Sequence, residues 1–173
     1  MLGVDIEPDD KDWTWVLQRP CPECGLDSGS VPAEQVAART RVNAAAWRDV
    51  LGRPDVGDRP RAATWSPLEY ACHVRDVLRL YDERLQRMLS EDDPLFANWD
   101  QDATAVAERY AEQQPAAVAD ALCGAADVLA ARFEGVQDWS RPGRRGDGAT
   151  FTVETFARYF LHDVVHHLHD VRS

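Results

Sequence analysis

The chain has 173 residues, of which 45% are hydrophobic, and its formal net charge is −11. This length suits a single domain that buries a core without disulfides, and no stretch approaches the roughly 18 uninterrupted apolar residues of a membrane-spanning helix. Because phosphate backbones are bound by basic surfaces, the negative charge also argues against a nucleic-acid-binding protein.

Residues 1–29 are expected to form an irregular extension, punctuated by proline and glycine. The acidic N-terminus lacks the basic and apolar regions of a secretory signal, which favours a cytoplasmic protein. The extension contains Cys21-Pro-Glu-Cys24, which has the spacing of half a zinc ribbon, but no second pair of this kind is present. Three roles stay open for the pair: binding a metal with other residues, cycling between dithiol and disulfide, or capping the fold. The chain's other two cysteines, Cys72 and Cys123, are expected to be reduced thiols.

The remaining residues, 30–173, are expected to form one helical domain. Hydrophobic periodicity and end signals predict four long helices over residues 30–51, 67–89, 115–135 and 153–171, with a short helix around 104–110. The clearest start is Ser66-Pro67-Leu68-Glu69, which offers an N-cap serine, proline at the first helical position and a capping-box glutamate. No convincing strand alternation appears. The sequence therefore predicts an all-α four-helix bundle, where sites are commonly built from side chains on facing helices.

The last predicted helix carries four of the chain's five histidines. His162 and His166 are four residues apart, so their side chains leave one face a turn apart and can chelate one ion. A solvated polar face is the alternative. His167 falls instead among the apolar residues of the helix. The fifth histidine, His73, lies at the margin of the apolar face of the second helix, where a buried histidine held by a hydrogen bond is the alternative to a metal ligand.

The segment His162-Asp-Val-Val-His166 also has the spacing of the zinc-protease motif His-Glu-x-x-His. Its acid is Asp163, one methylene shorter than the glutamate base of that motif, and few residues follow to supply a downstream third ligand. If the third ligand comes from upstream, His73 is the only histidine there.

Three segments resemble the DinB-like superfamily, whose members include bacillithiol and mycothiol S-transferases and relatives of maleylpyruvate isomerase. They are Trp65-Ser-Pro-Leu-Glu-Tyr-Ala-Cys-His73, Tyr110-Ala-Glu-Gln-Gln-Pro-Ala-Ala-Val118 and Leu161-His-Asp-Val-Val-His-His-Leu-His169. The resemblance covers about residues 30–173 and implies a bundle in which one histidine of the second helix and two of the fourth bind a divalent metal. In this sequence those residues are His73, His162 and His166, and His169 could replace or supplement one of them.

Three neutral imidazoles leave coordination positions open, as in a catalytic metal site. Zinc is the first expectation, and nickel or iron would also suit imidazole ligands. The resemblance implies a thiol-dependent S-transferase, in which the metal stabilises the thiolate of a low-molecular-weight thiol that attacks a small electrophile. The alternatives are a metal-assisted hydrolase and a non-catalytic metal-binding or stress-associated interaction protein. Homodimer formation is left open.

No residue makes a specific case as general acid or base. Asp76, Asp163 and Asp170 are spaced to orient the imidazoles, although solvated carboxylates are the plainer interpretation. Similarly, the arginines of the loop before the last helix, Arg141, Arg144 and Arg145, could bind an anionic thiol cofactor or be solvated.

Overall fold

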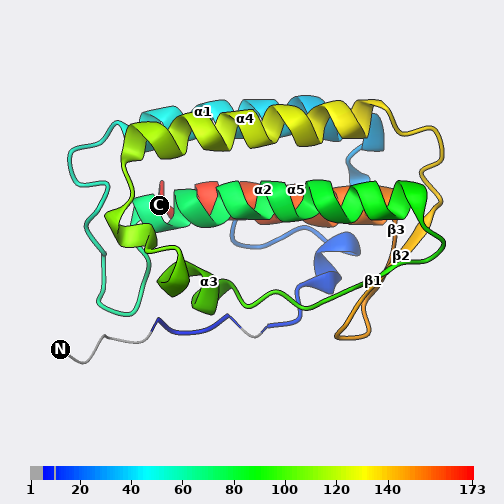
Figure 1. Ribbon diagram of the computed structural model, residues 1–173, viewed down its shortest axis with the longest axis horizontal. Helices are drawn as coiled ribbons and strands as arrows, with labels where there is room; N and C mark the ends of the chain where they lie inside the picture. The colour runs from blue at the N-terminus through cyan, green and yellow to red at the C-terminus, as the bar shows by residue number, and fades with distance from the viewer. Residues whose placement is uncertain (1–5, 10) are drawn as a thin grey trace.

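The computed structural model describes residues 6–9 and 11–173. Within this part of the chain four long helices form a two-layer bundle: α1 (Val36–Leu51), α2 (Pro67–Ser90), α4 (Pro115–Glu134) and α5 (Val153–Asp170). Helices α1 and α4 form one layer, and α2 and α5 form the other (Figure 1). The predicted four-helix bundle is confirmed.

Two of the helices begin at side-chain caps that the sequence makes evident. The Ser66 hydroxyl accepts a hydrogen bond from the Glu69 amide at 3.2 Å, and the Glu69 carboxylate accepts one from the Ser66 amide at 2.8 Å. At the start of α5, the Thr152 hydroxyl accepts from the Thr155 amide at 3.2 Å. These bonds satisfy amide groups that the first turn of a helix leaves without a partner.

The first long helix begins later than predicted. Residues Ser28–Ser30 and Ala33–Gln35 form the short 3₁₀ turns η2 and η3, and α1 starts only at Val36. Val31 and Pro32 are extended between the two turns, with ψ angles of 124° and 131°. A residue before proline is biased away from helical ψ, which explains the delay.

A small three-stranded sheet is the element that the sequence did not predict. Strand β1 (Leu95–Phe96) pairs in parallel with β2 (Pro142–Arg145), which pairs antiparallel with β3 (Thr150–Thr152). The sheet is a minor addition to the all-α bundle, and no strand alternation had indicated it. These strands are too short to show an alternating pattern, and the first pairing joins segments far apart in the chain.

The short helix between α2 and α4 is also shifted from its predicted range. Helix α3 spans Gln101–Ala107, because the Asp100 side chain accepts a hydrogen bond from the Ala103 amide at 2.9 Å and caps it there. The 3₁₀ turn η4 (Tyr110–Glu112) follows, after Arg109 in a left-handed conformation with φ 52°.

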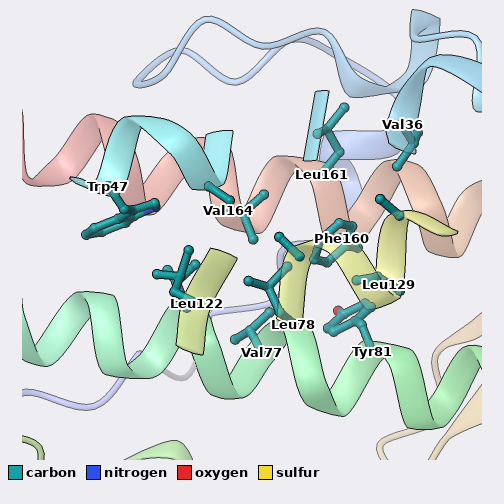
Figure 2. Packing of buried hydrophobic residues seen from close by; sticks show 14 of the residues in the cluster. Val36, Trp47, Val77, Leu78, Tyr81, Leu122, Leu129, Phe160, Leu161 and Val164 are labelled. Atoms are coloured by element: carbon teal, nitrogen blue, oxygen red, sulfur yellow. The ribbon is translucent and has the colours of Figure 1, made fainter. Parts of the chain in front are cut away.

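The core fills the space between the two helical layers. Leu78 and Tyr81 of α2, Leu122 and Leu129 of α4, and Phe160 of α5 converge there and are almost fully buried (Figure 2). A buried polar contact also links α1 to α5, since the Asn43 side-chain amide donates to the Val164 carbonyl at 3.1 Å. Helix α5 is therefore fixed to the bundle by both apolar packing and a polar contact.

The N-terminal segment packs on the bundle and is not a free tail in the residues described. The 3₁₀ turn η1 (Thr14–Leu17) and η2 contact α5, and the side chains of Val16 and Cys21 are buried. In Figure 1 this segment, drawn in blue, runs along the side of α2 and α5 that faces away from α1 and α4. The proposed division after residue 29 remains a prediction.

Residues 1–5 and 10, on which much of the expectation about a secretory signal rests, lie outside the described residues. No helix in the described part of the chain has both the length and the apolar character needed to cross a membrane.

Candidate functional site

A cavity of about 640 Å³ lies between the N-terminal segment, α2 and α5. Its lining includes His73 of α2, four polar residues of α5 (His162, Asp163, His166, His167), and the indole rings of Trp13, Trp65 and Trp99. Four of the five histidines of the chain therefore face one cavity.

One group of ligating side chains joins α2 to α5. It consists of His73, Asp163 and His167, whose ligand atoms all lie within 4.8 Å of one another. The Nε2 atoms of His73 and His167 are 3.2 Å apart, and Nε2 of His167 is 3.0 Å from a carboxylate oxygen of Asp163.

The surroundings of His73 keep its ring neutral and fixed in orientation. The side chain is buried, and burial followed by repulsion from His167 lowers its pKa to about 3. Its Nδ1 atom has no hydrogen-bond partner in residues 6–9 and 11–173, but the ring stacks on Trp99 with 5.4 Å between centroids and 8° between planes. A neutral imidazole is the form that binds metal ions.

The electrostatics around His167 favour positive charge. Burial alone would lower the pKa of His167, but the carboxylates of Asp163 and Asp170 outweigh it, and the pKa is raised. Burial would likewise raise the pKa of Asp163, yet its ion pair with His167 lowers it. A position where a buried carboxylate stabilises a positive charge is suited to a cation.

A second group joins the N-terminal segment to α5. It consists of Cys21, Cys24, His162 and His166, whose ligand atoms again lie within 4.8 Å of one another. The sulfur of Cys21 is 3.7 Å from Nδ1 of His166. In the absence of a cation, burial raises the pKa of the Cys24 thiol to about 11 and, together with repulsion from His166, lowers that of His162 to about 4.

The structure brings together two of the three predicted metal ligands. His162 and His166 are neighbours, with ring centroids 5.1 Å apart. Among the ligand groups that the described residues form within 4.8 Å, however, none joins His73 to either of them, and none contains His169. The three-histidine site therefore remains a prediction, and the geometry divides its members between two groups.

Asp163 and His167 belong to a candidate ligand group that the sequence analysis did not propose. His167 was assigned to the apolar side of the last helix, and that side is where α2 brings His73 toward it. A signal was available, because Asp163 and His167 repeat the four-residue spacing of His162 and His166 one position later.

Of the other polar residues considered in the sequence analysis, some line the cavity and others are paired elsewhere. Arg145 lines the cavity, whereas the guanidinium of Arg144 pairs with Asp93 and that of Arg141 donates to the Met88 carbonyl. Asp76 is hydrogen-bonded to Arg75 and Tyr110. All four cysteines are free thiols, as expected for Cys72 and Cys123.

Comparison with known proteins supports this architecture. The profile of the DinB superfamily matches residues 37–171. The chain is also similar in structure to YfiT from Bacillus subtilis, described as a probable metal-dependent hydrolase with an unusual four-helix bundle topology. The two share 16% sequence identity and a TM-score of 0.63 over 96% of this chain and 91% of YfiT. A search of curated proteins gave no match.

Proposed function

The chain belongs to the DinB superfamily, and we propose that it is a metal-dependent enzyme that acts on a small molecule bound in the cavity. The observation that carries this proposal is the convergence of His73, Asp163 and His167 on one point of the cavity wall. Zinc is the preferred ion, although nickel and iron would suit the same imidazoles.

The residues present fit a divalent cation. Two nitrogen or oxygen ligands of a tetrahedral zinc ion stand roughly 3.3 Å apart, given bond lengths near 2.0–2.1 Å. The distances of 3.2 Å between the two histidine nitrogens and 3.0 Å from His167 to Asp163 are close to that separation. Two histidines and one carboxylate are also a ligand set of catalytic zinc sites, in which a further position stays open.

His73, Asp163 and His167 would hold the ion, and other cavity residues would position the substrate. A divalent ion in this place would lower the pKa of a thiol or of water and polarise an electrophilic carbonyl. Burial raises the pKa of Tyr70 to about 12, so its hydroxyl stays protonated and can donate a hydrogen bond to the substrate. The guanidinium of Arg145, also in the lining, provides a donor for an anionic substituent.

The nucleophile is expected to come from outside the protein. Cys21 and Cys24 belong to the second ligand group, and the Cys72 sulfur is buried toward the Tyr110 carbonyl at 3.8 Å. A low-molecular-weight thiol is the preferred nucleophile by analogy with the S-transferases that the sequence resembles, and a cavity of about 640 Å³ is in the range of pockets that enclose a whole organic ligand. The reaction would then be thiol S-transfer to a small electrophile.

Hydrolysis is the second candidate, with water in place of the thiol. The structural similarity to YfiT, a probable metal-dependent hydrolase, favours it. The metal-loaded protein should be incubated with a panel of small electrophiles, with and without a low-molecular-weight thiol. Thiol-dependent product supports transfer, product without thiol supports hydrolysis, and inactivity of the metal-loaded protein across the panel would favour a non-catalytic binding protein.

The choice of ligands has its own test. If His73, Asp163 and His167 bind the catalytic metal, His167→Ala should abolish turnover as completely as His73→Ala does. The three-histidine alternative predicts that His167→Ala stays active while His162→Ala and His166→Ala do not. His169→Ala is the matched control on the same helix, because its side chain joins none of the ligand groups found in the described residues.

A further inference from the structure

The second ligand group points to a function separate from that of the cavity. We propose that Cys21, Cys24, His162 and His166 form a structural zinc site that fastens the N-terminal segment to α5. Cys21 and Cys24, which have the spacing of half a zinc ribbon, would thus be joined by two histidines of the last helix.

The ligand set and its spacing are those of zinc. Two thiolates and two imidazoles make up a Cys₂His₂ site, and four protein ligands close the coordination sphere, as in structural zinc sites. A sulfur and a nitrogen bound to one tetrahedral zinc ion stand roughly 3.6 Å apart. The Cys21 sulfur and Nδ1 of His166 are 3.7 Å apart, and all four ligand atoms lie within 4.8 Å of one another.

The backbone of the cysteine loop is turned so that both sulfurs can reach one ion. The Cys21 amide donates to the Leu26 carbonyl, and the Gly25 amide donates to the Cys21 carbonyl, each at 2.9 Å. Gly25 adopts φ +77°, a left-handed conformation that glycine reaches without strain. The loop is therefore a closed turn with Cys21 at its start and Cys24 near its end.

The histidines are buried and oriented toward this loop. His162 is 4% exposed, and its Nε2 atom has no hydrogen-bond partner among the described residues. Leaving a buried imidazole nitrogen without a partner is costly, and a metal bond would satisfy it. Trp13 covers both rings, with its centroid 5.6 Å from that of His162 and 5.0 Å from that of His166.

The second nitrogen of His166 also has the environment of a metal ligand. Its Nε2 atom lies 3.4 Å from a carboxylate oxygen of Glu23 and 3.6 Å from one of Asp170. Metal-bound histidines commonly donate their other N–H to a carboxylate, which fixes the ring and strengthens the bond. The Nδ1 atom is thereby left to face Cys21.

The zinc site would fix the position of the N-terminal segment, which forms one wall of the cavity. Ile6, Glu7, Asp9 and Trp13 line the cavity from the N-terminal segment. The zinc ion would hold this segment against α5 at the point where Trp13 covers the histidines. This zinc ion has a structural role, so its loss would leave His73, Asp163 and His167 in the protein.

Metal content and spectroscopy test the proposal. Protein reloaded with zinc and desalted should hold two ions per chain. Cys21→Ser/Cys24→Ser should lose one of them, whereas Cys123→Ser, a thiol of α4 outside the ligand groups, should lose none. With cobalt(II) in place of zinc, the wild type and His73→Ala should show thiolate-to-cobalt charge transfer in the near ultraviolet, and the double cysteine variant should not.

A measurement on the wild-type protein tests the proposal even if the variants fail to fold. Hydrogen exchange of residues 13–26 should become at least tenfold faster after chelation, while exchange in α4 changes little. Absence of the thiolate band from cobalt-loaded wild type, or its persistence in the double cysteine variant, would overturn the proposal. So would a Cys21–Cys24 disulfide in protein purified under reducing conditions. These results are independent of turnover, which reports on the His73 group.

Discussion

On α5, His162 and His166 face the N-terminal segment, whereas His167 contacts His73 of α2 and Asp163 lies beside these two histidines. Each pair has a spacing of four residues, and the second pair is displaced by one position, which is a rotation of about 100° around the helix axis. One helix thus supplies ligands to two groups on different sides. Single substitutions should therefore affect one group and spare the other.

Replacing Asp163 by asparagine should weaken metal binding to the His73 group. The amide keeps the shape of the side chain but removes the charge that favours a cation beside His167. We expect at least a roughly tenfold loss of zinc affinity, since even indirect carboxylate partners of metal ligands are worth that much. Competition with a chromophoric chelator measures this loss. An unchanged affinity would remove Asp163 from the ligand set, and His169→Ala serves as the control.

Glu69 gives the protein a pH-dependent stability. Burial would raise its pKa, but hydrogen bonds from Arg59 and the Ser66 amide lower it below 4.5. The folded state thus binds the Glu69 proton less readily than the unfolded state does. The stabilisation is complete above the unfolded pKa and is lost as the pH falls through the lower, folded pKa.

Glu69→Gln should consequently reduce the free energy of unfolding by about 2 kcal/mol at neutral pH, the scale of a hydrogen bond to a charged group. The difference from wild type should shrink as the pH falls below about 4.5. Urea denaturation at a series of pH values provides the measurement. Glu91→Gln is the control, because its pair with Arg87 is exposed and should matter less. A pH-independent difference would mean that packing, rather than charge, accounts for the effect.

Among the elements, the N-terminal turns η1 and η2 flank the loop that carries Cys21 and Cys24. Turns η1 and η2 contact each other and α5, and the Ser28 hydroxyl donates to the Val16 carbonyl at 2.8 Å. Gly29 in η2 lies so close to η1 that an added Cβ would stand 2.4 Å from the Leu17 carbonyl oxygen. The packing of these turns thus requires a residue without a side chain at position 29.

Gly29→Ala should destabilise the protein by about 1–3 kcal/mol, because the backbone of η1 must move to relieve the overlap. Zinc held by the cysteine loop should also exchange faster. Thermal unfolding and zinc competition provide the two measurements. Gly57→Ala is a matched control, since an added Cβ there meets nothing within 4 Å. Equal stability of the two variants would show that η1 and η2 do not pack closely.

For the molecule as a whole, stability comes from the apolar contact between the two helical layers. Leu122 of α4 is fully buried at their interface, near Leu78 of α2 and Val164 of α5 (Figure 2). The apolar contacts with α1 and α4 also hold in place α2 and α5, which carry His73 and His167. Core packing therefore supports the arrangement of the candidate ligand group.

Leu122→Ala should lower the free energy of unfolding by about 2–5 kcal/mol through lost apolar burial and a residual cavity. Val128→Ala on the same helix should cost less than about 0.5 kcal/mol, because Val128 is 53% exposed. Urea denaturation of the apoproteins compares them without metal linkage. A small effect at Leu122 would contradict the close packing between the layers.

The sequence by itself determined the helices and part of the site. Capping residues such as Ser66 and Thr152 and the apolar periodicity act over a few residues, so four long helices and a bundle could be predicted. The same local geometry predicted that His162 and His166 lie side by side. The start of α1 was placed too early, because the extended conformation at Val31 and Pro32 was not recognised.

Only the tertiary structure decided which distant residues meet. The pairing of Leu95 with Arg144 in the sheet, of His73 with His167, and of Cys21 with His166 each joins segments separated by long stretches of chain. Such contacts depend on how the helices rotate and where the N-terminal turns pack, which no local pattern specifies. The rotation of α5 divides its histidines between two ligand groups, because adjacent residues on a helix point about 100° apart.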